Sequence, residues 1–98
     1  MHLTITLAVL FAIQANAQSF VAWSGSACDG DEGDVVACDG TCFPFGGRHS
    51  YEVLGTSATV ALFVDGGCTG EQFTFGPDPP GECINVNTGT DIESFLCV

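Results

Sequence analysis

The sequence has almost no positive charge. It contains no lysine and a single arginine, Arg48, against twelve acidic residues, and its formal net charge is −11 at pH 7. Proteins that bind nucleic acid or anionic membranes neutralise phosphate groups with Lys and Arg. We therefore expect neither partner, whereas a neutral or cationic partner fits the charge. The simplest interpretation of the acids is a solvated surface that keeps the protein soluble.

The sequence also lacks a hydrophobic run long enough to span a bilayer. The longest run, Leu3 to Ile13, has eleven residues, whereas a membrane helix needs about twenty. It is followed by Gln14-Ala15-Asn16-Ala17, an A-x-A pattern that predicts a secretory signal peptide over residues 1–17. A buried N-terminal strand or helix is the alternative. The predicted mature protein, residues 18–98, is expected to be a single domain that is secreted, extracellular and monomeric, with no membrane span.

Residues suited to catalysis are scarce in this mature part. His49 is its only histidine. Ser50 and Glu52 are near it in sequence, but adjacent residues of a strand face opposite sides, which argues against a catalytic triad. No glycine-rich loop carries a lysine for phosphate, and no pair of acids stands out for glycoside hydrolysis. We therefore predict that the protein is not an enzyme and uses no cofactor.

All six cysteines follow the predicted cleavage site. An even number of cysteines in a short secreted chain predicts a disulfide framework, which a domain of this size needs because its hydrophobic core is small. Zinc is a weak alternative, because Cys38 and Cys42 are the only closely spaced pair. The number of cysteines alone leaves the pairing open. The cysteines are Cys28, Cys38, Cys42, Cys68, Cys83 and Cys97.

The mature part is predicted to be all-β. No window has the helical spacing of apolar residues, and thirteen glycines and four prolines separate short runs of β-branched and aromatic residues. Pro44 marks an edge strand or bulge, and residues 76–81, rich in Pro and Gly, are expected to form only a loop. Eight strands in two sets of four predict two Greek keys packed as a sandwich. The predicted strands are 19–23, 34–38, 41–45, 50–54, 58–64, 71–75, 82–86 and 92–98.

The two halves of the chain repeat one pattern. Trp23 is followed five residues later by Cys28 and seven later by Gly30, and Phe63, Cys68 and Gly70 have the same spacing. Further on, Cys42-Phe43 corresponds to Cys83-Ile84, and Ser50-Tyr51 corresponds to Ser94-Phe95. We expect the glycines to permit a folded hairpin after the first strand. We expect each serine hydroxyl to bond a backbone group of that hairpin.

This pattern resembles the Greek key of the βγ-crystallins, with Cys28 and Cys68 in place of the second aromatic residue. The resemblance covers about residues 20–98 and divides them into Greek key 1, about 19–55, and Greek key 2, about 58–98. Residues 83–94 are also similar to secreted cysteine-rich fungal proteins, including a crystallin-fold yeast killer toxin. The whole chain resembles small secreted cysteine-rich proteins of mushroom-forming fungi. The repeat suggests the disulfides Cys28–Cys42, Cys68–Cys83 and Cys38–Cys97.

Many microbial βγ-crystallins bind calcium through two Asn or Asp residues placed shortly before the motif serine. The corresponding segments here, residues 45–50 and 89–94, do not begin with two such residues, and Arg48 lies in the first. The acidic segment 29–34 begins like an EF-hand loop but lacks the later glutamate. We therefore expect no metal site.

Three classes of function remain open. The first is a non-catalytic binding protein, either an effector or an antimicrobial toxin that recognises a cell-surface or wall component. The second is a structural protein of a fungal wall or fruiting body. The third, a small hydrolase or hydrolase inhibitor, has no motif in its favour.

Overall fold

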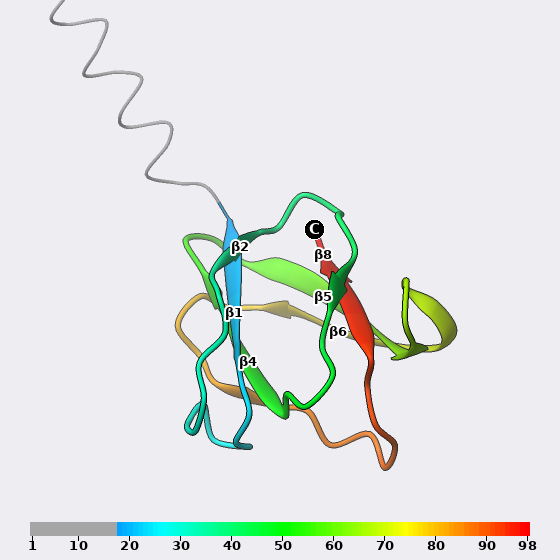
Figure 1. Ribbon diagram of the computed structural model, residues 1–98. Coiled ribbons are helices and arrows are strands. Elements are labelled where there is room, and N and C mark those ends of the chain that lie inside the picture. The colour runs from blue at the N-terminus through cyan, green and yellow to red at the C-terminus, as the bar shows by residue number, and fades with distance from the viewer. Residues whose placement is uncertain (1–17) are drawn as a thin grey trace, which may run out of the picture.

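The computed structural model describes residues 18–98, so the predicted signal peptide lies outside the described residues. These residues form eight strands in two four-stranded antiparallel sheets and contain no helix, which confirms the all-β class (Figure 1). The strands are β1 Ser19–Trp23, β2 Val36–Ala37, β3 Phe43–Pro44, β4 Ser50–Leu54, β5 Ala58–Asp65, β6 Thr69–Asp78, β7 Ile84–Asn85 and β8 Ser94–Cys97.

Each half of the chain gives its third strand to the other sheet. The first sheet has the order β2-β1-β4-β7, and the second has the order β3-β8-β5-β6. The exchange respects the sequence repeat, because Tyr51 of β4 pairs with Ile84 of β7 while the equivalent Phe95 of β8 pairs with Phe43 of β3. The two predicted Greek keys are therefore interlocked.

Three of the four strands at the sheet edges are much shorter than predicted. β2, β3 and β7 contain two residues each, where the sequence predicted five. Pro44 lies in β3 at the edge of its sheet, as expected of a residue that has no N–H to donate. β6 is longer than predicted and reaches Asp78, so the first three residues of the predicted loop 76–81 belong to a strand. A bulge between the Ala58 and Val60 pairings accommodates this extension.

The core lies between the sheets and is rich in aromatic rings. The ring of Phe20 from the first sheet stacks on Phe95 from the second at a centroid distance of 4.0 Å, and on Tyr51 at 4.9 Å. Phe45 meets Phe95 edge-on at 5.7 Å. Aromatic pairs of this kind contribute about 0.5–1.5 kcal/mol beyond the area that they bury. The cluster therefore joins the two halves of the chain.

One buried polar contact also joins the sheets. The Tyr51 hydroxyl of β4 donates a hydrogen bond of 2.5 Å to Asp78 Oδ2 at the end of β6, and both residues are buried. Burial first, and then the bond to Asp78 and its charge, raise the pKa of the Tyr51 phenol far above its usual value. This contact was not predicted, because Asp78 lies in the segment that was expected to be a loop.

Two of the three suggested disulfides are wrong. The structure joins Cys28 to Cys83 and Cys42 to Cys68, and only the suggested Cys38–Cys97 bond is present. The exchange of strands explains the difference. Cys42 immediately precedes β3 and so lies next to the second sheet, beside the turn after β5 that carries Cys68. Cys83 precedes β7 in the first sheet, beside Cys28. The two bonds are equivalent, with Cα–Cα distances of 5.9 and 6.0 Å.

Candidate functional site

A folded hairpin follows the first strand of each half. We call residues 24–33 the first hairpin and residues 64–72 the second hairpin. In the first, Ser24 N donates to Asp31 O at 2.9 Å, and Gly33 N donates to Ala22 O at 2.8 Å. The side chains at the tip, including Asp29 and Asp31, are exposed. The backbone bonds therefore present an ordered acidic turn to solvent.

Positive φ angles recur at equivalent positions of the two hairpins. Cys28 and Cys68 have φ angles of 54° and 56°, and Gly30 and Gly70 have 78° and 82°. A Cβ atom added to Gly30 would lie 2.5 Å from Ser24 Oγ, and one added to Gly70 would lie 2.5 Å from a carboxylate oxygen of the same hairpin. Glycine is therefore required at both positions for conformation and for space.

Ser50 and Ser94 hold the hairpins onto the last strand of each half. Ser50 Oγ accepts a hydrogen bond from Cys28 N at 2.9 Å and donates one to Gly25 O at 2.5 Å. Ser94 Oγ makes the equivalent bonds, from Cys68 N at 2.8 Å and to Asp65 O at 2.5 Å. Both serines are fully buried. Each hydroxyl thus satisfies one backbone donor and one backbone acceptor of a hairpin.

The motif aromatics lie close to these hairpins but differ in exposure. Trp23 is the last residue of β1 and is half-buried, whereas Phe63 lies near the end of β5 and is 8% exposed. Each aromatic therefore comes directly before its hairpin along the chain.

Arg48 and His49, which precede β4, contact the first hairpin through their side chains. Arg48 Nη1 donates to Asp31 O at 2.8 Å. His49 Nδ1 lies 2.6 Å from Ser24 O, and because a carbonyl oxygen only accepts, Nδ1 carries the proton. The Ser50 hydroxyl is bonded to backbone groups, so the structure does not bring Ser50 and His49 together as a nucleophile and its base.

The first of the two segments that correspond to calcium sites in βγ-crystallins, residues 45–50, has other roles here. Phe45, the first residue of one such segment, is 1% exposed and belongs to the core. Arg48 in the same segment brings a positive charge to the first hairpin. Within residues 18–98, no three His, Cys, Asp or Glu side chains are grouped in a way that could hold a metal ion.

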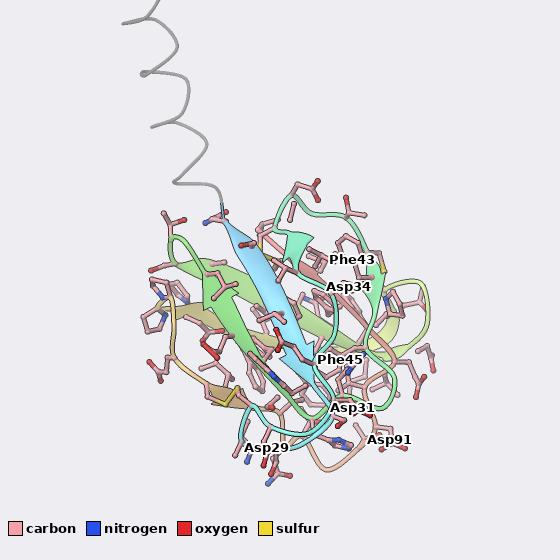
Figure 2. All side chains as sticks on the ribbon, turned by 60° about the vertical axis from the view of Figure 1, so that its left-hand side comes forward. Asp29, Asp31, Asp34, Phe43, Phe45 and Asp91 are labelled. Atoms are coloured by element: carbon pink, nitrogen blue, oxygen red, sulfur yellow. A yellow bond between two sulfur atoms is a disulfide. The ribbon has the colours of Figure 1, made fainter. Side chains whose placement is uncertain are left out.

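Acidic side chains gather at the end of the molecule that carries the first hairpin. Figure 2 shows Asp29 and Asp31 on this turn, with Asp34 further along the same segment. Asp91 belongs to a neighbouring loop that lines a small depression with Arg48 and His49. Asp29, Asp31 and Asp91 give this end an acidic character, and Arg48 lies beside Asp31 and Asp91.

The structure also contains an open cavity that sequence reasoning missed. Its volume is ≈ 340 Å³, and it lies where β2 and β3 form neighbouring edges of the two sheets. No local signal could have revealed it, because its lining comes from four strands and two loops. The lining residues are Phe20, Ala22, Gly33, Asp34, Val36, Phe43, Pro44, Arg48 and Phe95.

No helix among residues 18–98 is long and apolar enough to cross a membrane.

Comparison with known proteins establishes the fold but neither a family nor a function. No family model matches the sequence, and no curated protein matches it. The crystal structure of IPSE/alpha-1 from Schistosoma mansoni eggs is similar, with a TM-score of 0.53 and 17% identity over 84% of this chain and 84% of that chain. A W39D mutant of a βγ-crystallin domain from Clostridium beijerinckii also has a TM-score of 0.53, with 12% identity over 81% of this chain and 95% of that chain. The chain therefore has a crystallin-like fold.

Proposed function

We propose that the chain is a small secreted protein that acts without catalysis, by binding a cell-surface or cell-wall component as an effector or antimicrobial toxin. The observation that carries this proposal is the disulfide arrangement. Cys28–Cys83 and Cys42–Cys68 each fasten a hairpin to the residue just before a strand contributed by the other half of the chain. Exposed turns that are covalently fixed suit recognition, because little conformational entropy is lost when they bind.

The environment of the polar side chains supports a non-catalytic role. Ser50 and Ser94 are buried and bonded to backbone groups, so their hydroxyls are not available to a substrate. No cysteine among the described residues is free, which leaves no thiol nucleophile. Three disulfides in a chain of this size are typical of extracellular proteins.

The net negative charge argues against action on anionic membranes. Proteins that act on anionic membranes carry clusters of Lys and Arg, whereas this chain has one such residue and twelve acids. The proposed target is therefore a neutral or cationic component, such as a wall polysaccharide or a basic surface protein. The resemblance to secreted fungal proteins supports a fungal source.

A structural role in a wall or matrix is the second candidate. The same three disulfides favour it, because they would preserve the fold outside the cell. A structural protein is expected to stay in the wall fraction of its source after washing with high salt. A released effector is expected in the medium.

The proposal can be tested with the full chain expressed in a secreting host. The mass of the product should correspond to residues 18–98 with six oxidised cysteines. The purified protein is then applied to yeasts, filamentous fungi and bacteria, at acidic and neutral pH, beside a reduced and alkylated control. Selective growth inhibition, or saturable binding to one cell type, that disappears on reduction is the expected result. Equal activity of the reduced control, or no binding to any cell or wall at micromolar protein, would refute the proposal.

The repeat supplies a matched pair of variants for locating the contact surface. Asp31→Asn alters the first hairpin, and Glu71→Gln alters the equivalent exposed position of the second. If the acidic turn contacts the target, Asp31→Asn weakens binding while Glu71→Gln does not. The reverse result would place the contact on the second hairpin.

A further inference from the structure

The open cavity between β2 and β3 has the dimensions and lining of a small-molecule site. Its volume of ≈ 340 Å³ falls within the range of about 300–1,000 Å³ that is typical of ligand pockets. The cavity exists because β2 and β3 are only two residues long and leave the gap between the sheets uncovered. Phe20 of β1 and Phe95 of β8 form the inner part of the lining, and both are almost fully buried residues of the core.

Most of the lining is apolar. Val36 of β2 and Phe43 of β3 form opposite sides, and Ala22 and Pro44 extend the apolar surface. Figure 2 shows Phe43 and Asp34 close together at this side of the molecule. Such a lining fits an aromatic or aliphatic body, which gains free energy by leaving water.

Arg48, the only lysine or arginine in the sequence, lies in the wall of this cavity. Arg48 is half-buried, and its guanidinium is held by the bond to Asp31 O and by close packing on Gly33, where an added Cβ would lie 3.1 Å from Nη2. A guanidinium has several N–H donors, and only the Nη1 bond to Asp31 O engages it within residues 18–98. The remaining donors form a prepositioned site for an oxyanion.

We propose that this cavity binds a small amphipathic anion, with its apolar body between Phe43 and Val36 and its carboxylate on Arg48. Asp34, the other charged residue of the lining, is exposed. Its charge is therefore screened by water more strongly than that of the half-buried Arg48. The net negative charge of the protein acts over longer distances, and salt at physiological strength screens it beyond about 8 Å.

The test compares three probes that share one body and differ only in the head group: 4-phenylbutyrate, 4-phenylbutan-1-ol and 4-phenylbutylamine. The oxidised full chain, as secreted, is titrated with each probe and followed by two-dimensional NMR at physiological salt. The acid is expected to bind about tenfold more tightly than the alcohol, because a charge-assisted hydrogen bond replaces a neutral one. The amine is expected to bind most weakly. The shifted resonances should be those of the cavity lining.

Two substitutions separate the contributions of charge and shape. Arg48→Gln should remove the preference for the acid and leave binding of the alcohol unchanged, and retained alcohol binding also shows that the variant is folded. Val36→Trp should fill the cavity and abolish binding of all three probes. Val35→Trp is the matched control, because Val35 is 57% exposed and does not line the cavity.

Several results would overturn the inference. These are tighter binding of the amine than of the acid, an acid preference that survives Arg48→Gln, binding that survives Val36→Trp, or no binding of any probe at millimolar concentration. The site does not depend on the proposed cell-surface target, so failure of the growth and cell-binding assays would leave this test unaffected.

Discussion

Replacing Ser94 by alanine is expected to destabilise the protein far more than removal of a surface hydroxyl would. Ser94 is 1% exposed, and its hydroxyl is the partner of both Cys68 N and Asp65 O. Alanine at this position leaves one donor and one acceptor of the second hairpin without partners. Each such group costs about 1–3 kcal/mol when buried. Because these two are only partly buried, we expect a total loss of about 2–4 kcal/mol.

The loss can be measured by unfolding the oxidised protein in guanidinium chloride, followed by far-ultraviolet circular dichroism and the fluorescence of Trp23. For a domain of this size, the expected loss corresponds to a fall in Tm of roughly 10–25 °C. Ser50→Ala should give a similar loss, because Ser50 makes the equivalent bonds.

Thr69→Ala is the control for this prediction. Thr69 Oγ1 donates to Gly66 O at 2.7 Å in the same hairpin but is exposed, so its removal should cost less than about 1 kcal/mol. Equal losses for Thr69→Ala and Ser94→Ala would refute the argument, as would a loss below about 1 kcal/mol for Ser94→Ala.

The remaining predictions concern the Tyr51–Asp78 contact and the glycine of the second hairpin. Tyr51→Phe should cost about 1–3 kcal/mol in the same assay, because Asp78 would stay buried without its partner. Folding raises the pKa of the Tyr51 phenol above its usual value near 10. The buried, protonated Tyr51 therefore contributes its full stability below about pH 10, and this contribution is lost as the pH rises above 10. The wild type should therefore lose stability above about pH 10 through Tyr51, and equal alkaline slopes for the wild type and Tyr51→Phe would contradict this. Gly70→Ala should cost about 1–3 kcal/mol, because φ is positive and the added Cβ would meet a carboxylate oxygen. Gly66→Ala has open space around the added atom and should cost much less, so similar losses for the two glycines would count against the argument.

The fold could be predicted from the sequence because the signals that specify it are local and occur twice. The spacing of Cys28 and Gly30 after Trp23 predicted a folded hairpin after the first strand, and the repeat of that spacing predicted a second one. The lengths of the edge strands could not be predicted in this way. A strand ends where its neighbour stops offering hydrogen-bond partners, and that depends on residues far away in the chain.

The disulfide pairing is the clearest example of a feature that the repeat cannot predict. Joining Cys28 to Cys42 and Cys68 to Cys83 respects the equivalence of the two halves, but so does joining Cys28 to Cys83 and Cys42 to Cys68. Only the sheet in which β3 and β7 lie decides between the two arrangements. The short segments 43–44 and 84–85 carry no sequence signal for that choice.

The sequence predicted some features of the candidate sites and missed others. The repeat identified Ser50 and Ser94 as residues that could bond to the hairpins. The cavity beside Arg48 was not predicted, because it depends on two short edge strands that meet only in the folded protein. The partnership of Tyr51 and Asp78 was missed for a similar reason, since Pro77 beside Asp78 indicated a loop.

Mapping the disulfides of the native protein would decide whether β3 and β7 are exchanged between the sheets. An acidic residue separates each cysteine from the next one along the chain, so cleavage at Asp and Glu isolates all six on different peptides. Digestion at acidic pH without reductant suppresses exchange between disulfides, because the attacking thiolate is scarce. Mass spectrometry should find Cys28 linked to Cys83, Cys42 linked to Cys68, and Cys38 linked to Cys97. Peptides that join Cys28 to Cys42 and Cys68 to Cys83 would show instead that each half is closed on itself, and would contradict the interlocked arrangement.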